Sequence, residues 1–142
     1  MRKITEHIVA GDPEGHQLTI EVIDSPGAGG ACHEYSVRLR IAAGQKNALR
    51  SGTSVLVEGS ETTFELCRLS FQNGPIREAG VNGVTNEILL AVVIDRLRCF
   101  QGGLYPSPHN AAALAHCEDA LMELQHRTRD RIKRGVEGKT EA

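Results

Sequence analysis

Hydrophobic and polar positions follow different periods before and after Phe71. Up to that residue, apolar side chains recur at about every second position, which is typical of strands with one buried face. The segments with this pattern are 4–9, 18–22, 35–41, 55–57 and 64–69, and turn-forming sequences stand between them at 11–15, 25–31 and 59–63. Short strands with tight turns predict an antiparallel meander with one solvent-exposed face.

Beyond Phe71 the pattern changes to that of helices. Residues 74–83, GPIREAGVNG, contain three glycines and predict an irregular connector. Thr85 is a suitable N-cap for a helix that extends to about Gln101 and ends at a pair of glycines. The middle of this helix, residues 88–94, is apolar all round, so more than one neighbouring surface must cover it.

A second helix is predicted after a short loop. Ser107 is its expected N-cap, Pro108 fits the first helical position, and Gly135 can end the helix after about Arg134. Packing positions recur at alternating spacings of three and four, which predicts a narrow seam formed by Leu114, Cys117, Leu121, Leu124 and Thr128. At 1.5 Å per residue this helix is roughly 40 Å long and the first is about 25 Å, so its last turns overhang its partner. We expect the tail from Val136 onward to be loose.

These patterns predict an α+β protein. A small N-terminal antiparallel β-sheet domain is expected over residues 1–71, followed by a connector and a C-terminal two-helix hairpin over residues 72–142. The core must be mainly aliphatic, because the chain has only five aromatic residues and no tryptophan. Short chains of this kind often gain burial by self-association, and the apolar first helix points the same way, so we expect a homo-oligomer.

The composition argues against several classes of protein. The formal net charge is −2, so no DNA or RNA polymer is expected as a partner. The longest apolar run has seven residues, which is too short to cross a membrane. No signal-peptide pattern opens the chain, and the four cysteines lack metal-binding spacings, which predicts free thiols in a reducing cytoplasm.

Basic residues concentrate near the end of the second helix. Arg127, Arg131 and Arg134 stand at positions i, i+4 and i+7 and therefore share one face. Their guanidinium groups suit phosphates, which accept paired hydrogen bonds. The same pattern is typical of a solvated helix end, where basic residues favour the helix dipole, and spacing alone favours that simpler interpretation.

A second candidate site lies where the two helices meet. Phe100 closes the first helix and Asn110 opens the second, so the hairpin places a flat aromatic face near an amide that could stack a base and read its edge. A hydrophobic plug and an ordinary first-turn residue explain these two positions more simply. The connector could present Arg77 and backbone N–H groups to an anion, but it lacks a P-loop ending, and an ordinary loop is the simpler interpretation.

No catalytic pattern is apparent in the sequence. The six histidines are scattered without an HExxH or HxH pair, and Ser107 lies outside any GxSxG motif. A hydrolase would need a nucleophile and a base that these residues do not supply. We therefore expect a protein that is not an enzyme and that uses no metal and no cofactor.

Two segments resemble a known hairpin. FQNGPIREAGVNGVTNEILLAVVIDRL, followed by ALMELQHRTRDRIKRGVEG, resembles the helical hairpin shared by two phage families, the Thoeris anti-defence sponges of the first type and the second anti-CBASS sponges. The GVNGVTNE and RGVEG blocks are its most specific parts. Residues 24–37, DSPGAGGACHEYSV, resemble the β-domain of the Thoeris family, which the anti-CBASS family largely lacks. The resemblance therefore favours the Thoeris family.

The resemblance implies a function and an assembly. It implies a non-enzymatic protein in the cytoplasm of the infected bacterial host that binds, without cleaving, glycocyclic ADP-ribose signals made by TIR-domain enzymes. It also implies a homo-oligomer, for which we expect a hexamer built as a trimer of dimers. Some members of the family also hold cyclic trinucleotides of CBASS at separate pockets.

The resemblance also assigns residues, and it overturns the simpler interpretation of both sites. It assigns Phe100 and Asn110 to cyclic ADP-ribose binding, with Arg77 as a further contact. Cyclic trinucleotide binding falls to Arg127 and Arg131, and we add Arg134 on the same face. Two other functions stay open: a cyclic oligonucleotide sponge acting mainly against CBASS, and a virion assembly protein.

Overall fold

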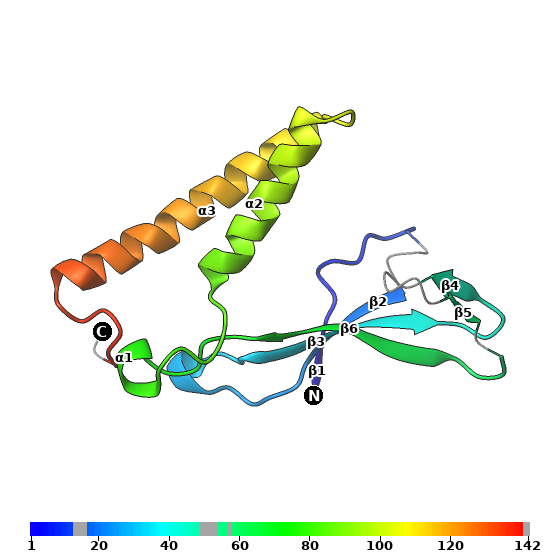
Figure 1. The fold of residues 1–142 in the computed structure, drawn as a ribbon, viewed down its shortest axis with the longest axis horizontal. Coiled ribbons are helices and arrows are strands. Elements are labelled where there is room, and N and C mark those ends of the chain that lie inside the picture. The colour runs from blue at the N-terminus through cyan, green and yellow to red at the C-terminus, as the bar shows by residue number, and fades with distance from the viewer. Residues whose placement is uncertain (13–16, 49–53, 57, 141–142) are drawn as a thin grey trace. The chain divides into compact units, whose positions relative to one another are not determined.

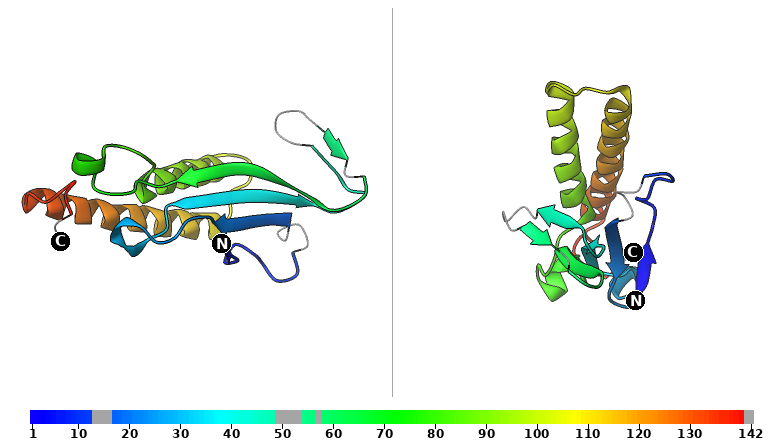
Figure 2. Two further views of the ribbon diagram at one scale, coloured as in Figure 1. Left: turned by 90° about the horizontal axis from the view of Figure 1, so that it is seen from below. Right: turned by 90° about the vertical axis from the view of Figure 1, so that its right-hand side faces the viewer.

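The computed structural model describes residues 1–12, 17–48, 54–56 and 58–140. The chain divides into two compact units, Met1–Ser70 and Phe71–Ala142. The first holds the strands and a short 3-10 helix, η2 (Ala28–Gly30), and the second holds the α-helices (Figures 1 and 2). The predicted α+β class, with an N-terminal antiparallel sheet followed by helices, is confirmed.

The sheet of the first unit has four strands in the order β1-β2-β3-β6, and all neighbours are antiparallel. These strands are β1 (Arg2–Ile4), β2 (Leu18–Val22), β3 (Glu34–Ile41) and β6 (Thr62–Ser70). A separate two-stranded ribbon, which the sequence pattern did not predict in full, pairs β4 (Lys46–Ala48) with β5 (Ser54–Leu56). It belongs to the excursion of the chain between β3 and β6.

One strand prediction needs correction, and another can be compared with the structure only in part. The first strand ends at Ile4 instead of Val9, because the Ile8 N–H donates to the Thr5 carbonyl at 3.0 Å and closes a turn there. Apolar residues in that segment do not alternate strictly, so they define no sheet face. The predicted strand 55–57 corresponds to β5, but Val57 and turn residues 13–15 lie outside the described residues.

The core of the sheet unit forms on one face of β3. Leu39 and Ile41 are buried, as their alternation predicts, and Phe64 packs against them. Ser36, on the opposite face, is buried as well, and its hydroxyl donates to the Glu65 carboxylate. The ladder between β3 and β6 shifts register between Val37 and Arg38, a bulge that simple alternation cannot reveal.

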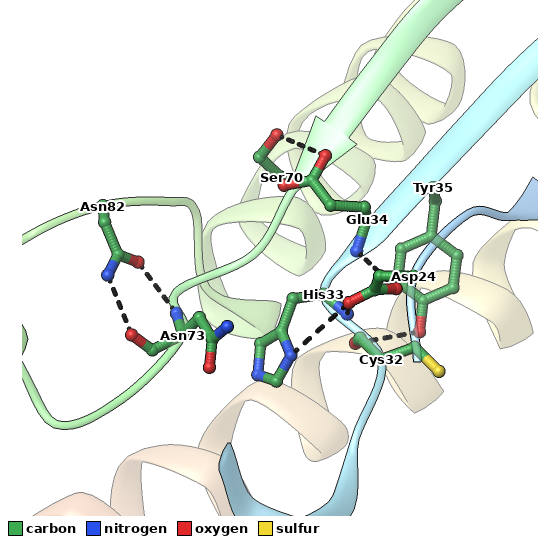
Figure 3. A network of polar contacts seen from close by, with 8 residues as sticks. All are labelled: Asp24, Cys32, His33, Glu34, Tyr35, Ser70, Asn73 and Asn82. Atoms are coloured by element: carbon green, nitrogen blue, oxygen red, sulfur yellow. Dashed lines mark hydrogen bonds and ion pairs between the residues drawn. The ribbon is translucent and has the colours of Figure 1, made fainter. Parts of the chain in front are cut away.

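A carboxylate closes the glycine-rich connection between β2 and β3 (Figure 3). Asp24 accepts the backbone N–H groups of His33 at 2.8 Å and of Glu34 at 3.1 Å. Partial burial raises the pKa of Asp24, but these N–H donors outweigh it and hold the pKa below its ordinary value of 3.8. The hydroxyl of Tyr35 donates to the Cys32 carbonyl beside it. The loop is therefore fixed by its own ends.

The second unit contains the predicted hairpin of α2 (Asn86–Gly102) and α3 (Pro108–Lys133). Both N-caps are confirmed: Thr85 Oγ1 accepts from Ile88 N at 3.3 Å, and Ser107 Oγ accepts from Asn110 N at 3.0 Å. Gly135, at φ 71°, follows the last residues of α3 in the left-handed conformation expected of a helix-ending glycine.

The connector before α2 is more regular than its glycines suggested. It contains one helical turn, α1 (Ile76–Ala79), and its two ends are joined. Asn82 accepts from Asn73 N and donates to the Asn73 carbonyl, each at 2.8 Å (Figure 3). A Cβ at Gly83 would overlap the backbone of Phe71, so this glycine is required by close approach. The GVNG block therefore closes a loop.

Candidate ligand-binding sites on the helical hairpin

The packing seam of α3 extends further than the sequence pattern indicated. Half-buried side chains recur at spacings of four and three along the helix, at Asn110, Leu114, Cys117, Leu121, Leu124, Thr128 and Arg131. The predicted seam is thus prolonged by one position at each end, and both added positions were predicted as ligand-binding residues. Because α2 has 17 residues and α3 has 26, α2 is shorter by about 13 Å. Arg131 lies on the overhanging part.

The tip of the hairpin, residues 96–110, presents two groups that a ligand could use. Phe100 is 45% exposed, and the Arg96 guanidinium carbon lies 5.8 Å from the centroid of its ring. The side-chain amide of Asn110 has no hydrogen-bond partner among the described residues. An aromatic face with a cation beside it and an uncommitted amide can stack a base, read its edge and attract a phosphate.

The loop of the tip is fixed at its base and exposed at its turn. Gln101 Oε1 accepts the Ser107 N–H at 2.8 Å, and Ser107 in turn caps α3. Leu104 and Tyr105, within the loop, are 89% and 76% exposed. The loop thus holds apolar and aromatic surface in solvent close to Phe100 in the sequence. The sequence interpretation did not include Arg96 or Gln101 among the candidate residues, although the i, i+4 spacing of Arg96 and Phe100 could have indicated the first.

At the other end of the hairpin, Arg131 is already bound to the chain that follows α3. Its side chain is only 22% exposed. Nη2 donates to the Val136 and Lys139 carbonyls, each at 2.9 Å, and Nε donates to Glu137 at 3.0 Å. The Arg131 carbonyl accepts the Val136 N–H at 3.0 Å, as in a Schellman cap. A residue predicted to hold phosphate therefore has a structural role as well.

Residues 136–140 contact α1, so the prediction of a loose tail is wrong for this described segment. The Gly138 carbonyl accepts the Arg77 N–H at 3.2 Å, and Thr140 Oγ1 donates to the Glu78 carboxylate at 2.9 Å. Figure 1 shows the chain turning back after α3 toward α1. The overhang of α3 leaves a half-buried position without α2 beside it, and the returning chain covers that position.

The predicted site residues therefore gather at two ends. Phe100 and Asn110 belong to the tip, whereas the backbone of Arg77 contacts the turn that follows α3. One hairpin does not bring Arg77 to the residues with which the resemblance groups it. Arg127 is exposed and has no ion-pair partner among the described residues, and Arg134 is the exposed C-cap of α3.

A shallow groove of about 290 Å³ runs between the helices. It is lined mainly by apolar residues of both helices, and an ion pair of 2.7 Å joins Arg98 to Glu118 across it. Within the described ranges no three histidine, cysteine or acidic side chains come together as a metal site would require. None of the helices described is both long and apolar enough to cross a membrane.

Comparison with known proteins identifies the hairpin. Residues 67–129 match the family described as the Acb2/Tad1 hairpin domain. A relative from Bacillus phage SBSphiJ7, named Thoeris anti-defense 1, is 45% identical over 89 residues, which cover 63% of this chain and 63% of the relative. The match thus spans less than two thirds of the relative's length.

The segment that matches the hairpin domain includes the connector, the whole of α2 and most of α3. The named relative is a Thoeris anti-defence protein, so the two matches support the Thoeris anti-defence family that the resemblance predicted.

Proposed function

We propose that this protein protects a phage from Thoeris immunity by sequestering a cyclic ADP-ribose signal in the cytoplasm of the infected bacterium. The signal, a glycocyclic ADP-ribose made by a TIR-domain enzyme, is held intact and so never reaches its effector. The 45% identity over 89 residues with the relative named Thoeris anti-defense 1 supports the biological role. The exposed face of Phe100 and the uncommitted amide of Asn110 support the binding mode.

The observation that carries the proposal is the chemistry of the tip. Adenine needs a flat face and a partner for its polar edge, and Phe100 and Asn110 can provide both. The pyrophosphate needs a cation, which Arg96 can supply from its position over the Phe100 ring. Arg77, at the other end of the same hairpin, can join this pocket only if it comes from another subunit.

The proposal is tested by capture and release. The purified protein is mixed with the small-molecule product of an active TIR enzyme, separated from free ligand by filtration, and heated. Mass spectrometry of the released fraction should return the cyclic signal unchanged and in near-stoichiometric amount. A cleaved product would indicate an enzyme, and no retained signal would contradict the proposal.

A second ligand is proposed for the basic end of α3. Arg127, Arg131 and Arg134 lie within two turns, and the exposed guanidinium of Arg127 supports a role in holding the phosphates of a cyclic trinucleotide. Calorimetry with cyclic tri-adenylate and with a cyclic ADP-ribose isomer, each added to protein saturated with the other, should show two independent binding events.

The proposed assembly is a homo-oligomer, a hexamer made of three dimers. On α2, Ile88 and Val92 are 51% and 54% exposed one turn apart, although the helix needs cover on several sides. Light scattering should give a multiple of the 15.4 kDa chain mass. Val92→Glu should shift the protein toward smaller species, while Val81→Glu, at a 78% exposed position in the connector, should not. A monomer for the unmutated protein would contradict this proposal.

A further inference from the structure

The tip loop holds the most exposed aromatic side chain of the described chain. Tyr105 is 76% exposed, whereas Tyr35, Phe64 and Phe71 are half-buried. Its hydroxyl has no hydrogen-bond partner among the described residues. Together with Leu104 beside it and the half-exposed Phe100, it places three large apolar side chains in solvent within one short stretch. Apolar surface gathered in this way marks a place that another molecule covers.

Two backbone hydrogen bonds hold Tyr105 close to the turn that carries Phe100. The Gly103 N–H donates to the Phe100 carbonyl at 3.3 Å, and the Ser107 N–H donates to Gln101 Oε1 at 2.8 Å. Tyr105 lies two residues from Gly103 and two from Ser107, and two residues of chain span at most about 7 Å. Its ring is therefore confined to the neighbourhood of the last turn of α2.

The loop is also stiff. Tyr105 precedes Pro106 and Ser107 precedes Pro108, and a residue before proline is restricted to extended conformations. Ser107 shows this, with φ −144° and ψ 149°. Each proline fixes its own φ as well. A ligand that contacts Tyr105 therefore has few backbone torsions to order, which favours binding.

Phe100 alone would cover only part of a bound base. The Arg96 guanidinium, one helical turn earlier, lies over one face of its ring, with the carbon 5.8 Å from the centroid. A base can stack directly only on the face that Arg96 leaves free, and its own outer face would then remain in water. Tyr105 follows Phe100 in the chain, and no other aromatic side chain of the described residues is exposed.

We propose that Tyr105 is a further ligand-binding residue, whose ring covers the face of the adenine that Phe100 does not. The base of the cyclic signal is then held between two aromatic rings at the tip. This inference rests on the proposed function and deepens it, because it adds a second wall to the same site. The contact is made by the ring, so the tyrosine hydroxyl is not required for it.

Tyrosine fluorescence tests the contact directly. The chain has two tyrosines and no tryptophan, so each tyrosine can be observed alone. Tyr35→Phe leaves Tyr105 as the only tyrosine, and its fluorescence should be quenched until the protein is saturated with the purified cyclic product of a TIR enzyme. Tyr105→Phe is the matched control, since Tyr35 belongs to the sheet unit. An equal loss of signal in both variants would reflect only absorption by the ligand and would overturn the proposal.

Binding measurements then separate stacking from a general effect on the loop. Tyr105→Ala should weaken binding of the same product about tenfold, and Tyr105→Phe should bind as the unmutated protein does. Leu104→Ala removes the 89% exposed neighbour and should have little effect. The melting temperature should stay unchanged in Tyr105→Ala, because the side chain is exposed. Equal losses at the two positions would refute a specific role for the ring, and so would a smaller assembly of Tyr105→Ala in light scattering, which would show that a second copy covers Tyr105.

The same measurements distinguish this inference from the proposed function. If the unmutated protein retains none of the cyclic product, the proposed function fails and this inference fails with it. If the product is retained and Phe100→Ala weakens its binding, the tip site stands. Unchanged affinity of Tyr105→Ala together with unquenched Tyr105 fluorescence would then overturn the second wall alone.

Discussion

The two ends of the hairpin use their polar groups in opposite ways. At the tip, Phe100 and Tyr105 are exposed and the Asn110 amide has no hydrogen-bond partner among the described residues, while hydrogen bonds that involve Gln101 and Ser107 fix the loop. At the basic end, Arg131 is the most buried arginine, and its guanidinium already binds groups of the same chain. Arginines in a row on one helix face are therefore not equivalent binding residues. A guanidinium can bind a ligand only if tertiary contacts have not already engaged it.

The largest expected effect concerns the aromatic face at the tip. Phe100→Ala should weaken cyclic ADP-ribose binding by about tenfold to a hundredfold, since base–aromatic stacking contributes about 1–3 kcal/mol. Phe100→Tyr keeps the face and should bind nearly as well. Isothermal titration provides the measurement. Unchanged affinity in both Phe100→Ala and Asn110→Ala would show that the pocket lies elsewhere, and the contrast between the two ends would not hold.

A smaller effect is expected at the exposed arginine of the basic end. Arg127→Ala should reduce cyclic tri-adenylate affinity roughly tenfold, because a hydrogen bond to a charged group contributes about 1.5 kcal/mol or more. Arg129→Ala removes the same charge from an exposed position off the row and is the matched control. Neither change should affect cyclic ADP-ribose capture. Equal losses in the two variants would indicate a general effect of charge without a site.

The two helix caps give a further, smaller contrast. Ser107→Ala and Thr85→Ala each remove a side chain that caps a helix N-terminus, and each should lower the free energy of unfolding by about 1 kcal/mol. Only Ser107 belongs to the tip. Ser107→Ala alone should also weaken cyclic ADP-ribose binding, by severalfold. Thermal melts and titrations of both variants provide the check, and an equal effect on binding would mean that the tip loop does not shape the pocket.

The smallest expected effect is a loss of stability of the sheet unit at acidic pH. The Ser36 hydroxyl, followed by Arg68, lowers the pKa of Glu65 below 4.5, and the loop N–H groups lower that of Asp24 below 3.8. A lowered folded-state pKa contributes stability that is fully present above the ordinary value and is lost as the pH falls through the lowered one. Stability should therefore decline below about pH 4.5, as followed by circular dichroism. Asp24→Asn should be less stable near neutral pH and should show a weaker decline in acid.

Local sequence determined the secondary structure where short-range chemistry dominates. Thr85 and Ser107 cap helices because their hydroxyls reach N–H groups three residues later, and Pro108 and Gly135 suit the two ends of α3 by their own backbone preferences. The alternation of apolar and polar residues likewise predicted β2 and the buried face of β3, because neighbouring side chains of a strand point to opposite faces. The tip residues Phe100 and Asn110 could be proposed from their positions at these helix ends.

Tertiary structure decided what happens to Arg131, Arg77 and the tail. The contact between Glu78 and Thr140 joins residues 62 positions apart, and no local pattern encodes it. It arises because α2 is too short to cover the last seam position of α3, so the returning chain supplies the missing acceptors. The sequence by itself determined which residues could bind phosphate, and only the folded chain determined which guanidinium is already satisfied. The physical reason is that a buried arginine must find acceptors, and the nearest ones here belong to the turn that follows α3.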